Sequence, residues 1–261
     1  MIAPQSGAAT SEDAVLDGRL ILRQPVRGHR VGHDALLLAA SAPGNVRHGV
    51  DLGAGVGGAG LAFALRVAQA LVTLVEIDPA LAALAAENAA RPALLGRAAA
   101  VCADIATLAR PGGPAAPARG SADLVLMNPP FNDPTRRRAS PDPDRARAHA
   151  LPDPGIETWL KAADRLLEPG GRLALIHRPE ALAALLEGLG RRFGAVTLRP
   201  VHARPGMPAI RLLVGAVKGR RTPPALLPGL HLAELDGRPS AAAEAVLRRG
   251  VAITQALGEA A

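Results

Sequence analysis

The sequence predicts an α/β fold built on a mostly parallel sheet, and two observations support this prediction. Short apolar runs typical of buried strands alternate with stretches of helical periodicity, which is the pattern of β-α-β units. The last two strand-like runs, 194–203 and 209–219, are joined only by the rigid stretch 204–208, so we expect them to pair antiparallel at one edge. With 261 residues, of which 49% are hydrophobic, the chain can bury one sizeable core.

The N-terminal part is expected to form a hairpin and a short helix. Apolar residues alternate over 14–25 around Asp17-Gly18, which is a signal for a two-residue turn. The helix should cover 32–43, with Asp34 as its N-cap.

The central part supplies the sheet and its crossover helices. The pattern predicts strands over 46–55, 71–78, 97–104, 121–127 and 172–178, and helices over 58–70, 79–90, 154–171 and 179–190. With the two antiparallel runs this makes a seven-stranded sheet. Pro79 suits the first position of its helix, and Pro169-Gly170-Gly171 should stop the helix before the fifth strand. A further strand near Leu230 and a helix from about Ser240 are expected in the tail.

Composition narrows the class of protein. The formal charge of +7 favours a polyanionic partner such as RNA or DNA, although a charge that is nearly all arginine can equally reflect coding bias. The single cysteine, Cys102, excludes an internal disulfide framework and is expected to be a buried small apolar residue. Seven scattered histidines have no metal-ligand spacing, so no metal is expected. A secretory signal and a membrane-length apolar run are both missing from the pattern, and we expect a cytoplasmic protein.

A glycine turn follows the first central strand and opens a helix. Gly53, Gly55 and Gly58 fit G-x-G-x-x-G, and Glu76 ends the next strand about twenty residues later, as in dinucleotide-binding proteins. An NAD-dependent oxidoreductase is therefore one interpretation. Asp51, just before the turn, would repel a pyrophosphate but could attract the ammonium group of an amino-acid ligand.

Three acidic residues end three successive strands. Asp51, Glu76 and Asp104 should meet at the edge of the sheet where α/β proteins bind ligands. In this order they could accept from a methionine ammonium, from the ribose hydroxyls and from an adenine amino group, which suits S-adenosylmethionine. Each acid taken singly could also be a solvated strand end or a helix cap.

The fourth strand leads to Asn128-Pro129-Pro130-Phe131 at the same edge. The prolines fix φ and keep Asn128 extended, which leaves a rigid lip with the Asn128 amide and bare carbonyl oxygens. The Asn128 oxygen and the Pro129 carbonyl could accept both protons of a planar amine such as adenine N6 and orient its nitrogen toward a methyl donor. Phe131 could stack on a base splayed out of RNA. Asn128 to Phe131 are therefore the candidate catalytic residues.

These motifs resemble those of class I, Rossmann-like, S-adenosylmethionine-dependent methyltransferases. The stretches 28–40, 51–58, 75–79, 128–131 and 166–178 together resemble bacterial tRNA1(Val) adenine-N6 methyltransferases, over roughly 16–218. The resemblance implies cofactor binding by Asp51, Gly53, Gly55, Glu76, Asp104 and Asn128, and a tRNA partner methylated beside the anticodon. Val56 departs from it, because many relatives have a small polar residue there.

The resemblance also implies a domain organisation. A hairpin-helix extension, 1–45, should close over the cofactor site, with Arg30 and Asp34 near the methionine end. The methyltransferase domain should cover 46–220, and a strand-helix tail 221–261. The loop 132–154 is too long for an ordinary connection and carries five arginines that could grip the tRNA backbone or belong to a disordered segment: Arg136, Arg137, Arg138, Arg145 and Arg147.

Four functions stay open on the sequence. An rRNA guanine-N2 or a protein glutamine methyltransferase would use the same lip, although the segment before Asp51 is short for the separate substrate-binding domain of glutamine methyltransferases. An NAD oxidoreductase needs a proton donor, and the chain contains no tyrosine. A non-catalytic RNA-binding protein could retain the fold. Trp159 lies in a helical pattern and is expected in the core, and His177 is expected to be a satisfied strand-end residue.

Overall fold

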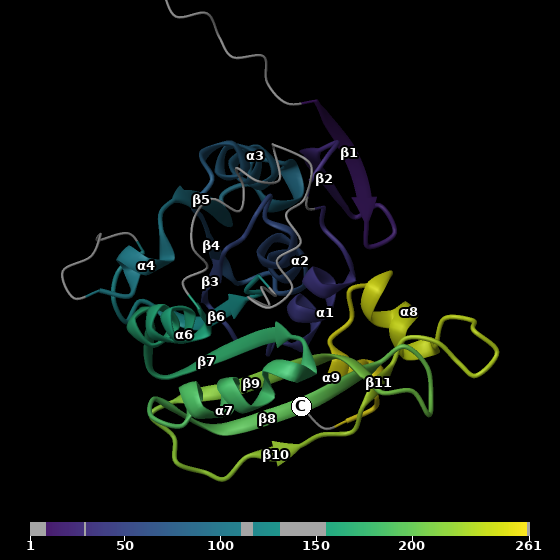
Figure 1. The fold of residues 1–261 in the computed structure, drawn as a ribbon. Helices are drawn as coiled ribbons and strands as arrows, with labels where there is room; N and C mark the ends of the chain where they lie inside the picture. Colours follow the sequence, from purple (N-terminus) through teal and green to yellow (C-terminus); the bar gives the residue numbers. More distant parts are fainter. Residues whose placement is uncertain (1–8, 29, 111–116, 131–154, 260–261) are drawn as a thin grey trace, which may run out of the picture.

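The computed structural model describes residues 9–28, 30–110, 117–130 and 155–259, and the predicted mostly parallel sheet is confirmed (Figure 1). Its main strands are His48–Leu52 (β3), Leu71–Glu76 (β4), Ala98–Cys102 (β5), Ala122–Met127 (β6), Leu167–His177 (β7), Phe193–His202 (β8) and Ala209–Lys218 (β9). These strands follow the order β5-β4-β3-β6-β7-β9-β8, and only the two pairs that involve β9 are antiparallel. The sheet has nine strands in all, because the two-residue strands Ala225–Leu226 (β10) and Leu230–His231 (β11) also pair with β8.

Helices cover both faces of the sheet. One layer contains His33–Ser41 (α1), Gly58–Arg66 (α2) and Pro79–Ala89 (α3), and the other contains Ile105–Leu108 (α4), Gly155–Leu166 (α6) and Leu182–Leu189 (α7). Strand β6 shows how the two cores are separated: Leu124 and Leu126 pack in the first, whereas Val125 and Met127 pack in the second. Because both faces are covered, the central strands are apolar without alternation.

The N-terminal hairpin is confirmed, but its turn is longer than predicted. Strands Thr10–Val15 (β1) and Leu20–Pro25 (β2) are joined by four residues, of which Leu16 and Asp17 have φ of 54° and 52°. The two-residue prediction was wrong because Leu16 is drawn into the main core, where it is only 4% exposed. Arg248 pairs with Asp17 at 3.1 Å, which links the turn to the C-terminal segment.

The C-terminal segment packs along β8 and α1. The expected strand near Leu230 is β11, and the expected helix is Ala241–Leu247 (α8), where the Ser240 hydroxyl accepts the N–H of Ala243 at 3.0 Å. Helix α8 and the short helix Ile253–Ala256 (α9) both contact α1. Buried Arg199 donates to Glu259 at 2.8 Å and to the Pro228 carbonyl at 2.8 Å, and so ties the end of the described chain to the sheet.

Two local predictions were wrong. Asp34 does not cap α1, which follows Gly32 without a side-chain cap; its carboxylate instead accepts from Arg211 Nε at 2.7 Å, and an ion pair to a distant strand replaced the local bond. Pro169-Gly170-Gly171 does not end a helix: α6 stops at Leu166, and β7 begins at Leu167 with an irregular register opposite β6. In the described ranges, no helix is both long and apolar enough to cross a membrane.

Candidate active site

The carboxyl ends of four neighbouring strands bring the candidate residues to one edge of the sheet. Leu52 of β3 lies opposite both Val75 of β4 and Met127 of β6, and Glu76 lies opposite Cys102 of β5. The residues that follow, Gly53, Asp104 and Asn128, therefore leave the sheet beside Glu76. The order across the edge, from β5 to β6, is the predicted one.

The glycine turn depends on a close approach between Gly53 and Trp159. Gly53 has a φ of 68°, and a Cβ built on it would lie 2.5 Å from Cη2 of Trp159. Trp159 comes from α6 and is 5% exposed, which confirms that it belongs to the core. Only glycine satisfies both the left-handed backbone and the indole beneath it.

Gly55 leaves open space at the same turn. Its φ is 57°, and a Cβ there would meet no heavy atom within 4 Å. Its N–H donates to Oε2 of Glu76 at 2.8 Å, while Oε1 of Glu76 accepts from the N–H groups of Ile77 and Asp78 at 2.8 and 2.9 Å. The Glu76 carboxylate thus holds the turn against the end of β4, while the space beside Gly55 stays open.

Asp51 is buried beneath the turn. It is 2% exposed, and its Oδ2 accepts the N–H of Gly60 at 2.7 Å. The pKa of the Asp51 carboxyl is raised to about 7, chiefly by burial and in smaller part by the charge of Glu76, while the hydrogen bond from the N–H of Gly60 lowers it. No cationic side chain of a described residue pairs with this carboxylate, and a positively charged ligand group would supply that charge.

Asp104 and Asn128 stand on either side of the turn. Asp104 is the N-cap of α4 and accepts from the N–H of Ala106 at 2.7 Å, so the helix-cap interpretation of this acid holds in the structure, and its second oxygen has no hydrogen bond to a described residue. The Asn128 side chain is half-buried and makes no hydrogen bond within the described part of the chain. Pro129 is buried and Pro130 exposed, which gives the lip a fixed base and an open rim.

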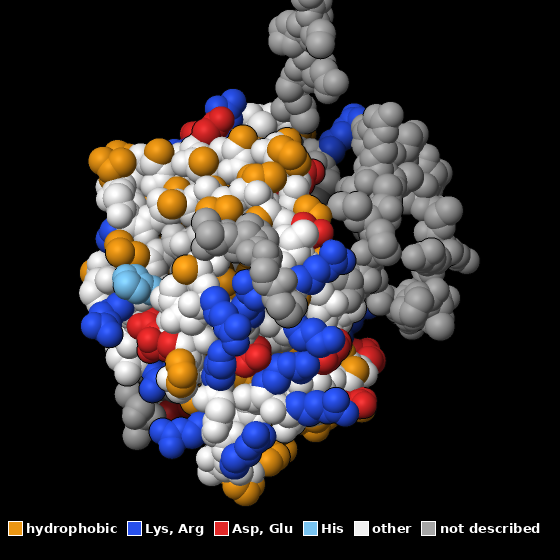
Figure 2. All heavy atoms as spheres, turned by 90° about the vertical axis from the view of Figure 1, so that its left-hand side faces the viewer, with side chains coloured by type: hydrophobic (Ala, Val, Ile, Leu, Met, Phe, Trp, Pro, Cys, Tyr) orange, Lys and Arg blue, Asp and Glu red, His pale blue; other side chains and the backbone are white. Residues whose placement is uncertain are grey.

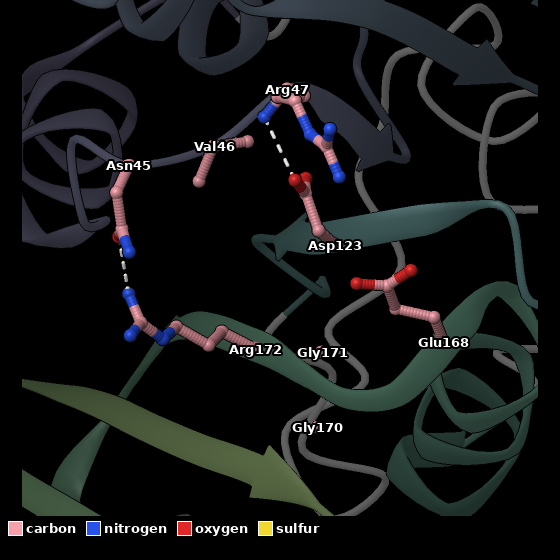
Figure 3. Close-up of a pocket in the computed structure, with 8 residues that line it drawn as sticks. All are labelled: Asn45, Val46, Arg47, Asp123, Glu168, Gly170, Gly171 and Arg172. Atoms are coloured by element: carbon pink, nitrogen blue, oxygen red, sulfur yellow. Dashed lines mark hydrogen bonds between the residues drawn. The ribbon is translucent and has the colours of Figure 1, made fainter.

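A separate polar pocket lies at the opposite edge of the sheet (Figure 3). It has a volume of about 240 Å³ and is lined by Asn45, Val46, Arg47, Asp123, Glu168, Gly170, Gly171 and Arg172. The Asp123 carboxylate accepts the N–H of Arg47 at 2.8 Å, and Arg172 donates to the Asn45 side chain at 2.6 Å. The amino ends of β3, β6 and β7 form this edge, so the pocket is distant from the candidate residues.

Comparison with known proteins gives the family. The sequence profile described as "Methyltransferase small domain" matches residues 31–200, which is more than half of the chain. The chain belongs to this methyltransferase family. The resemblance to class I methyltransferases is thereby confirmed, together with the Rossmann-like fold.

Individual members of the methyltransferase family agree with this assignment. A tRNA1(Val) (adenine(37)-N6)-methyltransferase of Aeromonas hydrophila is 33% identical, over 73% of this chain and 77% of its own length. One of the same name from Glaesserella parasuis is 32% identical over 60% of this chain, and the match spans just under two thirds of that relative, 63%. The crystal structure of a predicted O-methyltransferase, protein Atu636, from Agrobacterium tumefaciens superposes with a TM-score of 0.70 at 29% identity, over 84% of this chain and 97% of its own.

Asn88 supports the methyltransferase turn and was missed by the sequence analysis. It is fully buried on α3, where its Nδ2 donates to the carbonyls of Val56 and Arg23 at 3.0 Å each and its Oδ1 accepts the N–H of Arg23 at 2.8 Å. One amide therefore joins α3, the glycine turn and strand β2. The signal was present, because Asn88 continues the buried alanine stripe of Ala82 and Ala85 at a spacing of three.

The N-terminal segment also reaches the turn. Gln24 is buried, and its Oε1 accepts the N–H of Val31 at 2.9 Å. The Val31 side chain packs on Gly58, where an added Cβ would lie 2.7 Å from a Val31 methyl. Arg30 is held by an ion pair with Asp13. The residues before α1 thus lie against the start of α2.

Other candidate residues have mixed outcomes. Cys102 was expected to be buried but is exposed, because β5 is an edge strand; its Sγ lies 3.6 Å from the carbonyl of Ile77. His177 is half-buried at the end of β7, beside Arg178. Phe131 and the arginines of the loop 132–154 lie outside the described residues. Within the described ranges, no three His, Cys, Asp or Glu side chains are grouped to hold a metal ion.

Gly53→Ala should destabilise the protein more than Gly55→Ala. Both residues have positive φ, which costs a residue with a Cβ about 1–2 kcal/mol, but only at Gly53 would the new methyl also meet Trp159. We expect a loss of more than about 2 kcal/mol for Gly53→Ala and about 1 kcal/mol for Gly55→Ala, measured by urea unfolding. Equal losses would show that Trp159 does not constrain the turn.

Asn88→Leu should be strongly destabilising. The change leaves two backbone groups of Arg23 and the carbonyl of Val56 without their partner, and we expect a loss of about 2–4 kcal/mol in the free energy of unfolding. Gln69→Leu is the control, because Gln69 is an exposed amide with one bond to the Gly44 carbonyl, and it should cost less than about 1 kcal/mol. A loss at Asn88 no larger than at Gln69 would contradict this role.

Proposed function

We propose that this protein transfers a methyl group from S-adenosylmethionine to the exocyclic N6 of an adenine in tRNA. The observation that carries the proposal is the placement of Asn128 and Pro129 at the carboxyl end of β6, directly beside the glycine turn that follows β3. The partly exposed Asn128 amide has no hydrogen-bond partner among the described residues, so both its oxygen and its nitrogen are available to a ligand.

The residues of the edge suit the proposed cofactor. The open space at Gly55 admits a ligand against the backbone. Both Glu76 oxygens already accept from N–H groups, but Oε2 accepts from only one and has a second lone pair that can accept from a ribose hydroxyl. The second oxygen of Asp104 can accept from an adenine amino group. Asp51 supplies buried negative charge for the ammonium group. When bound, S-adenosylmethionine supplies the electrophilic methyl group and leaves as a neutral thioether.

The lip provides the positioning that methyl transfer to a planar amine needs. The lone pair of adenine N6 is delocalised into the ring, so the nitrogen is a poor nucleophile. Oδ1 of Asn128 and the carbonyl oxygen of Pro129 each accept a hydrogen bond from one N6–H group, which orients the nitrogen and draws it toward tetrahedral geometry. After the methyl group is attached, the nitrogen releases one proton to water. Since the two prolines fix this backbone, the acceptors do not reorganise during the reaction.

Nitrogen is favoured over oxygen as the acceptor. The relatives from Aeromonas and Glaesserella are named as adenine-N6 enzymes, whereas the Agrobacterium structure is described as a predicted O-methyltransferase. A hydroxyl has one proton and cannot use both acceptors of the lip, but an amino group can. We further propose the tRNA1(Val) adenine beside the anticodon as the target, on the names of these relatives.

The remaining organisation is part of the proposal. The extension 1–45 closes over the cofactor, which the packing of Val31 on Gly58 supports, and 46–220 and 221–261 act as the methyltransferase domain and its tail. Phe131 stacks on the target base and the arginines of 132–154 contact the tRNA backbone. The protein works in the cytoplasm, where tRNA is available, and needs no metal.

The acceptor is identified by incubating the purified protein with labelled S-adenosylmethionine and unmodified total RNA, followed by nucleoside separation. Label in N6-methyladenosine is the expected result. Label in N2-methylguanosine would indicate that the acceptor is an rRNA guanine and not a tRNA adenine. Label only in added protein would indicate a glutamine acceptor. If no acceptor is methylated, the NAD-dependent oxidoreductase and the non-catalytic RNA-binding protein remain as the alternative functions.

Asn128→Ala should lower kcat by at least about a hundredfold and leave the Kd for S-adenosylhomocysteine within a few-fold of that of the unchanged protein. The reason is that the amide contacts the amine in the transition state more than it contacts the cofactor. Asn45→Ala is the matched control, because Asn45 is an exposed asparagine at the opposite edge. If Asn128→Ala instead lost its affinity for S-adenosylhomocysteine but kept a normal kcat, the assignment of Asn128 to the acceptor amine would be contradicted.

The affinity for S-adenosylhomocysteine should rise with pH up to about 7. The pKa of Asp51 is raised to about 7, so below that pH the carboxyl is protonated and offers no charge to the ammonium group. Affinity should fall about tenfold per pH unit below the pKa, and Asp51→Asn should remove this dependence. Calorimetric titration between pH 5.5 and 7.5 measures both; a flat profile for the unchanged protein would contradict the role of Asp51.

The same group should reduce stability as pH rises. Its folded pKa lies above the ordinary value of 3.8, so between about pH 4 and pH 7 the folded protein keeps a proton that the unfolded chain has lost. The free energy of unfolding therefore falls as the pH rises through this window, and Asp51→Asn should remove the part of this fall that Asp51 causes. This gives a second readout that needs no ligand.

A further inference from the structure

The turn between β8 and β9 extends well beyond the edge that carries the proposed site. Met127 of β6 pairs with Leu175 of β7, which pairs with Val214 of β9, so Asn128 is level with Leu213. Strand β9 continues past that level to Ala209, and the turn 203–208 lies further still. With strands about 4.8 Å apart and about 3.3 Å per residue, the turn is about 10 Å to the side of Asn128 and about 15 Å beyond it.

This turn is held rigidly. Pro205 and Pro208 restrict its backbone, and Nδ1 of His202 lies 2.7 Å from the carbonyl oxygen of Met207. The His202 ring packs against the ring of His231, with 5.2 Å between centroids, and against Gly229, where an added Cβ would lie 2.9 Å from the imidazole. The turn is therefore fixed to the C-terminal segment.

Its outer surface is apolar and basic. Met207 is 49% exposed and Ile210 41% exposed, and the exposed guanidinium of Arg204 has no ion pair with a described residue. In contrast, the phenylalanine and tryptophan side chains of the described ranges (Phe63, Trp159 and Phe193) are all buried. Met207 is therefore an exposed apolar side chain on a stiff turn, on that side of the lip.

We propose that the turn 203–208 binds the RNA strand beside the target adenine, with Met207 packed on the face of a flanking base and Arg204 paired with a phosphate. This rests on the proposed function. The distance from Asn128 is too long for contact with the target base itself, so the turn recognises neighbouring nucleotides and sets the register of the strand. Apolar side chains are known to pack on unstacked bases, and arginine on backbone phosphate.

The other basic surface is less specific. Lysines and arginines gather on the face shown in Figure 2, over α6, α7 and the end of β9, but acidic side chains are interspersed with them. Arg192 pairs with Glu157 at 2.7 Å, and Lys218 with Asp164 at 3.5 Å. This face supplies a control rather than a second binding site.

The test compares two double variants on the unmodified anticodon stem-loop of a valine tRNA. One is Arg204→Ser with Met207→Ser, and the control is Arg221→Ser with Leu226→Ser, which removes an exposed arginine and a 77% exposed leucine away from the turn. We expect the first to raise KM about tenfold, to keep kcat and the affinity for S-adenosylhomocysteine, and to flatten the salt dependence of RNA binding by about one phosphate contact. The control should match the unchanged protein.

Abasic substitution of single flanking nucleotides locates the Met207 contact. One abasic position should weaken binding to the unchanged protein and to Met207→Leu, but should not weaken it further in Met207→Ser. The inference is overturned if the KM of both double variants equals that of the unchanged protein, or if KM rises equally in both. It is also overturned if no abasic position is coupled to Met207. If the unchanged protein methylates no RNA, the proposed function fails instead.

Discussion

The carboxylate of Glu76 binds three backbone N–H groups, and the site is built around this interaction. Two of them belong to Ile77 and Asp78 at the end of β4, and the third belongs to Gly55, so the glycine turn cannot leave the sheet. Trp159 fixes the turn from below and Asn88 from the side. These contacts bring elements from both helical layers to one point, and they leave open space beside Gly55 at the carboxyl ends of the strands.

The same edge concentrates groups that the folded chain does not satisfy by itself. Asp51 is buried with a pKa near 7, and Asn128 has no hydrogen-bond partner among the described residues. Burying Asp51 costs stability, and proteins tolerate such a cost mainly at functional sites, whereas the partly exposed Asn128 amide is simply open to a ligand. The cationic group of a bound methyl donor would neutralise Asp51, and the amino group of a separate acceptor would pair with Asn128, which is why the geometry supports methyl transfer better than dinucleotide binding.

Much of the fold and the order of the site followed from the sequence, because both depend on local patterns. The strand periods, Pro79 at the first position of α3 and the helix start near Ser240 depend on residues close together in the chain. What failed depends on distant contacts: Asp34 pairs with Arg211 instead of capping α1, and the exposure of Cys102 follows from the edge position of β5. Asn88 was missed because its partners, Arg23 and Val56, are far from it in the chain, although its position in an alanine stripe marked it as buried.

The proposed methyl transfer depends on where the methyl donor binds. A crystal structure with bound S-adenosylhomocysteine measures this directly. We expect the ribose hydroxyls at Glu76, the adenine near Asp104 and the sulfur facing Asn128. A ligand bound instead in the pocket between Asn45 and Arg172, at the opposite edge of the sheet, would contradict it.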